Sequence, residues 1–276
     1  MPWRPRPSDR FYRVIVRTGL TLRGLFRIQV IVSGGGHLRA PVPGNGAPRG
    51  ASRRVVPGRG AVVAITHFGY LDFVFAELLL WCYAKAQMRF LVTQAAADHW
   101  FAGLAVSAAG HVAVGYDSGS HAYDAAVARL KAGEYIAILP EAGVSRSFRV
   151  RECKTGAVRM AAEAGVPIIP VSVWGSHRLM TRRHGFSPAR AWRAPVRIHV
   201  GEPVTVDPAQ DARKATEALR GILQAGIDAC IADFPLTPSP GAWWMPADLG
   251  GGAPTDEERQ RLDEAEGPRR AGGRRR

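Results

Sequence analysis

Residues 61–84 read AVVAITHFGYLDFVFAELLLWCYA. Residues 61–66 are a short apolar run typical of a buried strand, and residues 70–84 are typical of a helix. Similar apolar runs alternate with helical segments along the chain as far as residue 232. Strands that alternate with helices predict an α/β fold: one layered domain with a mostly parallel mixed sheet flanked by helices.

The same periodicity predicts the other elements. Strands are expected over residues 89–92, 111–114, 135–139, 167–174 and 195–200, and helices over 94–109, 120–131, 155–164 and 208–232. Gly133 and Gly165 are expected to end two of these helices. Parallel strands have their carboxyl ends at one edge of a sheet. The loops after Thr66, Val114 and Leu139 should therefore meet at that edge, where open α/β sheets bind ligands.

The segment before this domain, residues 1–28, is expected to hold a basic amphipathic helix. Apolar residues recur at helical spacing over residues 8–27, namely Phe11, Val14, Ile15, Thr18, Leu22, Leu25 and Phe26. The arginines that lie largely off this stripe are Arg10, Arg13, Arg17 and Arg23. A basic face beside an apolar face is typical of a helix at a membrane interface. The helix can equally pack on its own domain, and each of its sides can do one of these jobs.

The main domain is expected to cover residues 29–235. Residues 236–276 are rich in Pro, Gly, Arg and acids, which predicts a flexible tail with a short helix around residues 256–266. The chain has three cysteines, which lie far apart. An odd, scattered set excludes a disulfide framework and a cysteine-rich zinc site.

Positive charge is concentrated at the N-terminal end. The 276 residues carry a formal net charge of +14, and residues 1–60 contribute +11 of it through twelve arginines and one acid, Asp9. This excess predicts an anionic partner, either nucleic acid or an anionic membrane surface. The most apolar stretch, residues 73–84, contains Glu77 and is too short to span a bilayer. Arginines also interrupt any signal-peptide core. We therefore expect a peripheral protein on the cytoplasmic face of the cell membrane.

His67 and Asp72 are the first candidates for chemistry. His67 follows a strand, and Asp72 comes five residues later, near the start of a helix. On a straight helix such side chains point about 140° apart, so they meet only if the chain turns between them, which Gly69 permits. A carboxylate beside a histidine fixes the ring and stabilises the imidazolium. The alternative is a helix-capping aspartate beside an unrelated histidine.

Residues 139–147, LPEAGVSRS, form the second candidate. Glu141 and Arg146 should lie at the same sheet edge as His67. Arg149, Arg151 and Lys154 follow near the start of a predicted helix. Arginine forks and helix N-termini both favour phosphate. The alternative is a polar loop with solvated bases.

The order of these motifs is more specific than any one of them. His-x4-Asp comes first, then GHVAV at residues 110–114, then Pro-Glu-Ala-Gly at 140–143 with a following Arg146, then VPIIPV at 166–171. Over residues 55–205 this order resembles the glycerolipid acyltransferases, the family of 1-acylglycerol-3-phosphate (lysophosphatidate) acyltransferases.

The resemblance implies a function for each candidate. His67 is the expected general base on an acceptor hydroxyl, and Asp72 orients it. Glu141 and Gly143 are expected to help bind the acceptor, and Arg146, with Lys154 as a second choice, its phosphate. The implied donor is a fatty acyl thioester, acyl-CoA or acyl carrier protein, and the implied acceptor is a lysophospholipid. No cofactor and no metal are implied.

The sequence departs from the family pattern at four positions. Thr66 stands where the family usually has Asn, Gly69 where it has Ser, and Tyr116 where it has a phosphate-binding arginine, while Arg146 comes two places late. These departures leave other acceptors open: glycerol-3-phosphate, a glycolipid or an amine lipid. A non-enzymatic basic protein that binds a membrane or nucleic acid is a further alternative. The bases are not interleaved with aromatic residues and no DNA-binding motif is present, which favours the membrane over nucleic acid.

Overall fold

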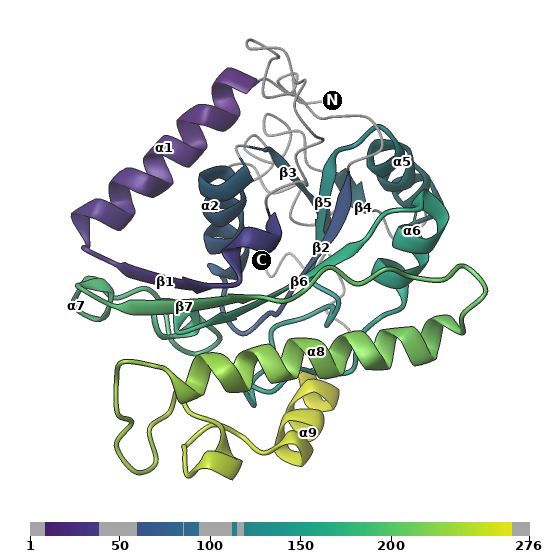
Figure 1. The fold of residues 1–276 in the computed structure, drawn as a ribbon. Coiled ribbons are helices and arrows are strands. Elements are labelled where there is room, and N and C mark those ends of the chain that lie inside the picture. Colours follow the sequence, from purple (N-terminus) through teal and green to yellow (C-terminus); the bar gives the residue numbers. More distant parts are fainter. Residues whose placement is uncertain (1–8, 39–59, 85, 94–111, 115–118, 267–276) are drawn as a thin grey trace, which may run out of the picture.

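A seven-stranded sheet forms the centre of the molecule (Figure 1). The structure is a computed structural model that describes residues 9–38, 60–84, 86–93, 112–114 and 119–266. Within these residues the strand order is β1-β7-β6-β2-β5-β3-β4. The strands are β1 Gln29–Ser33, β2 Ala61–Ile65, β3 Met88–Thr93, β4 Val112–Val114, β5 Tyr135–Ile138, β6 Ile168–Trp174 and β7 Pro195–Val200. Every pairing is parallel except that of β6 with β7, so the predicted mostly parallel mixed sheet is confirmed.

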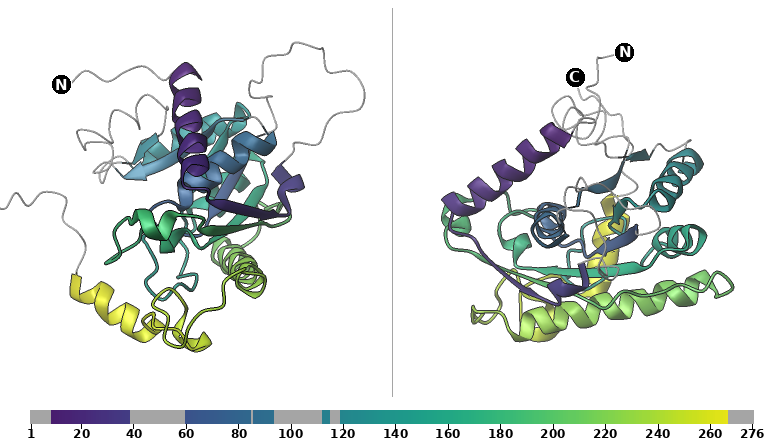
Figure 2. Two further views of the ribbon diagram at one scale, coloured as in Figure 1. Left: turned by 90° about the vertical axis from the view of Figure 1, so that its left-hand side faces the viewer. Right: turned by 45° about the horizontal axis from the view of Figure 1, so that its top comes forward.

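Helices cover both faces of the sheet (Figures 1 and 2). One face packs against α2 (Asp72–Ala84), and the other against α5 (Gly119–Lys131), α6 (Gly156–Ala164) and α8 (Ala212–Ala232). The side chains of β2 alternate between these two cores, and all five of its residues are buried. A strand covered on both faces is continuously apolar, as AVVAI is.

Local sequence signals explain several element ends. Gly165 has a φ of 65° and closes α6 in the left-handed conformation that glycine adopts without strain. The Asp211 side chain accepts hydrogen bonds from the N–H groups of Arg213 and Lys214, so α8 begins later than expected. The short helices are η1 (Gly35–Leu38), η2 (Ser176–Arg178), α7 (Pro188–Ala191) and η3 (Ala247–Leu249). The helix expected over residues 94–109 lies outside the described residues.

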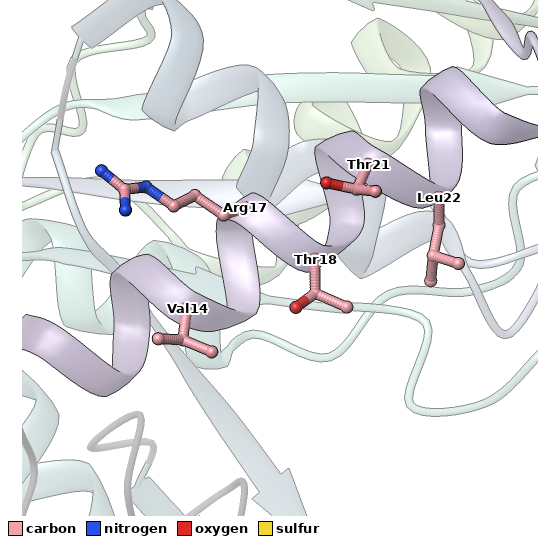
Figure 3. A pocket seen from close by; sticks show the side chains of 5 residues that line it. All are labelled: Val14, Arg17, Thr18, Thr21 and Leu22. Atoms are coloured by element: carbon pink, nitrogen blue, oxygen red, sulfur yellow. The ribbon is translucent and has the colours of Figure 1, made fainter.

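The N-terminal helix, α1 (Asp9–Leu25), forms an outer layer on α2 (Figure 1). Its buried side contains Tyr12 and Val16, which pack against Leu78 of α2. The predicted apolar stripe lies mainly on the other side: the exposed fractions are 37% for Phe11, 57% for Val14, 48% for Leu22 and 64% for Leu25. Val14 and Leu22 line a surface pocket on α1 together with Arg17, Thr18 and Thr21 (Figure 3). The helix thus packs on its own domain by one side and exposes apolar side chains on another.

After α1 the chain forms β1, a strand that the sequence analysis did not predict. It pairs in parallel with β7 at the end of the sheet. The residues that follow include the short helix η1. Because α1 packs on α2 and leads directly into the sheet, it is integrated with the domain that follows it.

Residues 236–266 belong to the folded domain, which differs from the flexible tail expected over residues 236–276. Ala242, Trp244, Met245 and Ala253 are buried in the core that also contains residues of α8. The helix α9 (Asp256–Glu266) coincides with the short helix expected there. It begins with a capping box in which Thr255 and Glu258 each accept a hydrogen bond from the other's backbone N–H. The prediction relied on the polar average composition of this segment. Its few apolar side chains, when buried, stabilise the folded state enough to hold the segment on the domain.

Candidate active site

His67 and Asp72 come together at the carboxyl end of β2. His67 lies in the short turn after the strand, and Asp72 is the first residue of α2. Nδ1 of His67 is 3.4 Å from Oδ2 of Asp72. The histidine side chain is 13% exposed and the aspartate is fully buried. The chain therefore turns between the two residues. The five-residue spacing required such a turn for the two side chains to meet.

The Asp72 carboxylate is held on both oxygens. Oδ2 accepts hydrogen bonds of 2.7 Å from the backbone N–H groups of Phe68 and Gly69. Oδ1 accepts a hydrogen bond from the hydroxyl of Ser176. These donors satisfy a fully buried carboxylate and fix its position behind the histidine ring.

This arrangement decides which nitrogen of His67 can act as a base. A carboxylate only accepts hydrogen bonds, so Asp72 favours the tautomer with hydrogen on Nδ1, which leaves the lone pair on Nε2. The 3.4 Å separation is longer than an ordinary hydrogen bond. Catalytic hydrogen bonds of this kind tighten when the substrate binds. The pair can therefore remove a proton from a group placed at Nε2.

Glu141 joins His67 to the loop between β5 and α6. The glutamate is 2% exposed. Its Oε1 accepts a 2.7 Å hydrogen bond from the backbone N–H of His67, and its Oε2 accepts one of 3.0 Å from that of Arg151. Burial raises the pKa of this carboxyl to about 8. Both oxygens are engaged by the backbone, so the geometry supports a positioning function, and contact with an acceptor stays a prediction.

The loop after Glu141 brings arginines close to the same edge. Its backbone is attached to His67 a second time, because the N–H of Ser145 donates to the carbonyl oxygen of His67 at 2.8 Å. A Cβ atom on Gly143 would lie 3.0 Å from Nη1 of Arg151, so the absence of a side chain leaves room for that guanidinium. Gly143 thus borders the Arg151 guanidinium, and its contact with an acceptor stays a prediction.

Arg146 and Arg151 share one carboxylate from α9. Nε of the buried Arg146 is 3.4 Å from Oδ1 of Asp263, and Nη2 of Arg151 is 3.3 Å from Oδ2. Nη1 of Arg259 is also 3.3 Å from Oδ2 of Asp263. Three guanidinium groups thus surround one carboxylate, and arginine guanidinium groups pair with carboxylates and phosphates in the same bidentate geometry. Lys154 is exposed, and its contact with the phosphate of an acceptor stays a prediction.

Two other sequence-based candidates have different surroundings. Arg149 pairs with Asp228 of α8 at 2.6 Å and with Asp248 of η3, which ties the loop to neighbouring elements. Tyr116 lies outside the described residues.

A segment that no sequence motif indicated packs against the His67 turn. Residues 173–181 run along this turn and contact it repeatedly. The N–H of Val173 donates to Oγ1 of Thr66 at 2.9 Å, and Oγ1 of Thr181 donates to the carbonyl oxygen of Phe68 at 2.6 Å. A Cβ atom on Gly69 would lie 2.7 Å from Cα of His177. No local sequence signal marks this segment, which reaches the turn because it continues β6, the strand that pairs with β2.

Comparison with known proteins supports the resemblance. Residues 49–174 match the family model described as Acyltransferase. This range includes the predicted site residues His67, Asp72, Glu141, Gly143, Arg146 and Lys154. No curated protein shows significant similarity to the chain. The fold is similar to the crystal structure of PlsC, the 1-acyl-sn-glycerophosphate (LPA) acyltransferase of Thermotoga maritima, with a TM-score of 0.59. That match has 18% sequence identity and covers 82% of this chain and 81% of the other. Residues 49–174 therefore form an acyltransferase domain, and the ordered motifs within it are similar to those of the glycerolipid acyltransferases.

Proposed function

We propose that this acyltransferase moves a fatty acyl group from an acyl thioester, such as acyl-CoA, to the hydroxyl of a lysophospholipid such as 1-acylglycerol-3-phosphate. The observation that carries the proposal is the His67–Asp72 pair, 3.4 Å apart, beside a loop that contains Arg146 and Arg151. A base for a hydroxyl and a cationic site for a phosphate are the two parts that such an acceptor requires. The structural similarity to PlsC, a 1-acyl-sn-glycerophosphate acyltransferase, agrees with this choice.

The proposed reaction needs no acyl-enzyme. Nε2 of His67 takes the proton of the acceptor hydroxyl as its oxygen attacks the thioester carbonyl carbon. The tetrahedral intermediate collapses, the carbon–sulfur bond breaks, and the thiolate takes the proton from the imidazolium. Asp72 stabilises the imidazolium throughout. A positioned base of this kind contributes about 10²–10⁴-fold to the rate.

The acceptor phosphate is proposed to bind at Arg146 and Arg151. In the structure the carboxylate of Asp263 lies between these side chains. A phosphate that uses both guanidinium groups must displace this carboxylate or bind beside it. The C-terminal helix α9 therefore affects how strongly the site attracts an anion.

We also propose that the enzyme works as a peripheral protein on an anionic membrane, at the cytoplasmic face. The exposed apolar residues of α1 support this, because they lie beside Arg10, Arg13 and Arg17 on the same helix. Such a helix binds at the headgroup level with its apolar side chains inserted. No helix in the described residues has the length and apolar content needed to cross a bilayer.

The test is acyl transfer by the full chain and its His67→Ala variant, with products identified by mass spectrometry. Donors are acyl-CoA and acyl carrier protein thioesters, and acceptors are lysophospholipids, glycerol-3-phosphate, glycolipids and amine lipids in anionic vesicles. We expect a loss of at least about 100-fold for His67→Ala. The matched control is His121→Ala, which changes an exposed histidine of α5. Full transfer by His67→Ala would disprove the mechanism, and the product formed by the wild type identifies the acceptor.

A further inference from the structure

Two exposed aromatic residues lie beside the C-terminal end of α1. Phe186 is 48% exposed and Trp192 is 53% exposed. The rings of Phe186 and Phe26 are 5.6 Å apart, and the guanidinium of Arg27 lies 5.5 Å from the centre of the Trp192 ring. The backbone connects the same segments, because the N–H of Arg193 donates to the carbonyl oxygen of Phe26 at 2.8 Å. Segment 182–193 is therefore attached to the end of the helix with the exposed apolar stripe.

The two segments form one side of the molecule although they are far apart in the sequence. Figures 1 and 2 show α7, which lies within segment 182–193, next to the end of α1 and the start of β1. Leu22 and Leu25 of α1 are exposed near that end. We call Phe186 and Trp192, with the arginines of the turns around them, the aromatic edge.

The charge around the aromatic edge identifies the kind of partner that it fits. Residues 164–201 contain six arginines and no acidic residue, and residues 10–60 also contain no acidic residue. Neither segment carries an acidic side chain of its own that would repel an anionic partner. An aromatic ring beside an arginine is typical of a protein surface at the level of lipid headgroups, where one end of the side chain is apolar and the other is wet.

The backbone gives an independent indication that these arginines serve a function. Among the described residues, five that are not glycine have a positive φ, and three of these are Arg27, Arg183 and Arg193, at 52°, 63° and 55°. Glycine adopts this conformation without strain, whereas an arginine does so at a cost. Backbone strain at three turns of the aromatic edge is typical of residues that are retained because they bind a partner.

We propose that the aromatic edge is a second membrane contact, which inserts Phe186 and Trp192 into an anionic lipid surface beside α1. Two contacts at separate points fix the tilt of the domain on the membrane, whereas one helix leaves the domain able to rotate about its axis. The inference rests on the proposed membrane association, but it requires no assumption about the reaction.

The first experiment measures binding of the full chain to vesicles of phosphatidylglycerol and phosphatidylcholine by co-sedimentation. The double variant Phe186→Ser/Trp192→Ser is expected to bind about tenfold more weakly or worse, because two exposed apolar side chains no longer insert. The matched control is Leu236→Ser/Leu249→Ser, in which the two leucines are 37% and 47% exposed and lie outside both segments. The control is expected to bind like the wild type.

The second experiment separates charge from folding. Arg27→Gly, Arg183→Gly and Arg193→Gly place glycine where φ is positive, so the triple variant should keep or raise the melting temperature. Its binding to anionic vesicles at low salt should fall by about fivefold for each arginine. Its weak binding to vesicles of phosphatidylcholine alone should not change.

The outcomes separate this inference from the proposed reaction. Weaker vesicle binding by both variants supports the aromatic edge whether or not acyl transfer is found. Wild-type vesicle binding by both variants, together with loss of binding by Val14→Ser/Leu22→Ser, would show that α1 is the contact without the aromatic edge. Retention of nucleic acid or an acidic carrier protein through Arg27, Arg183 and Arg193, with no vesicle binding, would also overturn the inference.

Discussion

Asp263 of α9 lies 3.4 Å from the guanidinium of Arg146, through its Oδ1 and the arginine Nε. A helix near the C-terminal end thus supplies the counter-charge of an arginine that is only 7% exposed. Such a buried cation is costly without a partner, so the same carboxylate that stabilises the loop also competes with an incoming phosphate.

Asp263→Asn should therefore separate stability from acceptor binding. The amide keeps the shape of the side chain and removes the competing charge. We expect the KM for a phosphate-bearing acceptor to fall roughly fivefold, which corresponds to about 1 kcal/mol for a partly exposed ion pair. The melting temperature should fall by a few degrees, because Arg146 loses its counter-charge. Steady-state kinetics and thermal unfolding of the same preparation measure both effects.

Asp248→Asn is the matched control for this change. Asp248 also pairs with an arginine of the loop, but its partner is Arg149, whereas Asp263 faces Arg146 and Arg151. Its KM should equal that of the wild type. A higher KM in Asp263→Asn would mean that Asp263 orients the arginines for phosphate rather than competing with it.

Ser176→Ala should slow catalysis without weakening acceptor binding. The hydroxyl of Ser176 donates to Oδ1 of Asp72, the carboxylate that we propose orients His67. A hydrogen bond to a charged group contributes about 1.5–3 kcal/mol, so kcat should fall roughly 10–100-fold while KM changes little. Ser176→Thr, which keeps the hydroxyl, should recover part of the rate.

Ser172→Ala tests whether any buried serine of this region has the same effect. Ser172 lies in β6 and donates a 2.8 Å hydrogen bond to the carbonyl oxygen of Leu223. Its loss should lower stability by about 1 kcal/mol, as expected for a neutral hydrogen bond, and leave kcat unchanged. Equal kcat values in the two alanine variants would show that Ser176 does not position Asp72 for catalysis.

Gly69→Ser should harm this protein although it introduces the residue that the family pattern usually has there. A Cβ atom at this position would lie 2.7 Å from Cα and 2.9 Å from N of His177. The backbone must move, at a cost of about 1–3 kcal/mol, and the turn that contains His67 moves with it. Thermal unfolding should show a lower melting temperature, and activity should fall with it.

Gly221→Ser provides the comparison, because no atom lies within 4 Å of a Cβ built on this glycine of α8. Its melting temperature should stay the same or rise slightly, since glycine is a poor helix former. If Gly69→Ser is as stable as Gly221→Ser, the close approach of His177 does not restrict the turn.

Glu77→Gln should change how stability depends on pH. Burial in α2 raises the pKa of the Glu77 carboxyl from 4.5 to about 7, although Tyr12 of α1 donates a hydrogen bond to it. The raised pKa means that this group favours the folded state fully below pH 4.5 and progressively less as pH rises through 7. The amide variant lacks this decrease, so its stability relative to the wild type should increase from pH 5 to pH 8 by up to about 3 kcal/mol.

Urea unfolding of both proteins across this pH range measures the difference, in which the contributions of all other groups cancel. Glu202→Gln, at an exposed position, is the matched control for the loss of one carboxyl group. A constant difference for Glu77→Gln would show that Glu77 is ionised in the folded protein throughout the range.

Much of the fold could be predicted because its signals are local. The apolar run at residues 61–66, the helical pattern after Tyr70 and the glycine after α6 depend on neighbours in the chain. Periodicity records such interactions directly. The five-residue spacing of His67 and Asp72 is equally local, so one turn suffices to bring the pair together.

Other features depend on contacts between distant residues, which no local pattern records. Ser176 reaches Asp72 only because β6 pairs with β2, and Asp263 reaches Arg146 only because residues 236–255 pack into the core and direct α9 to the loop. The strand β1 depends in the same way on β7 as its partner.

The sequence by itself determined the alternating elements, the acyltransferase motifs and the distribution of charge, because each follows from residue type and spacing. Only the tertiary structure decided which side of α1 is buried, what holds the Asp72 carboxylate and which acid faces Arg146. Each of these depends on packing and hydrogen bonding between segments that only the folded sheet and its helices bring within a few ångströms of each other.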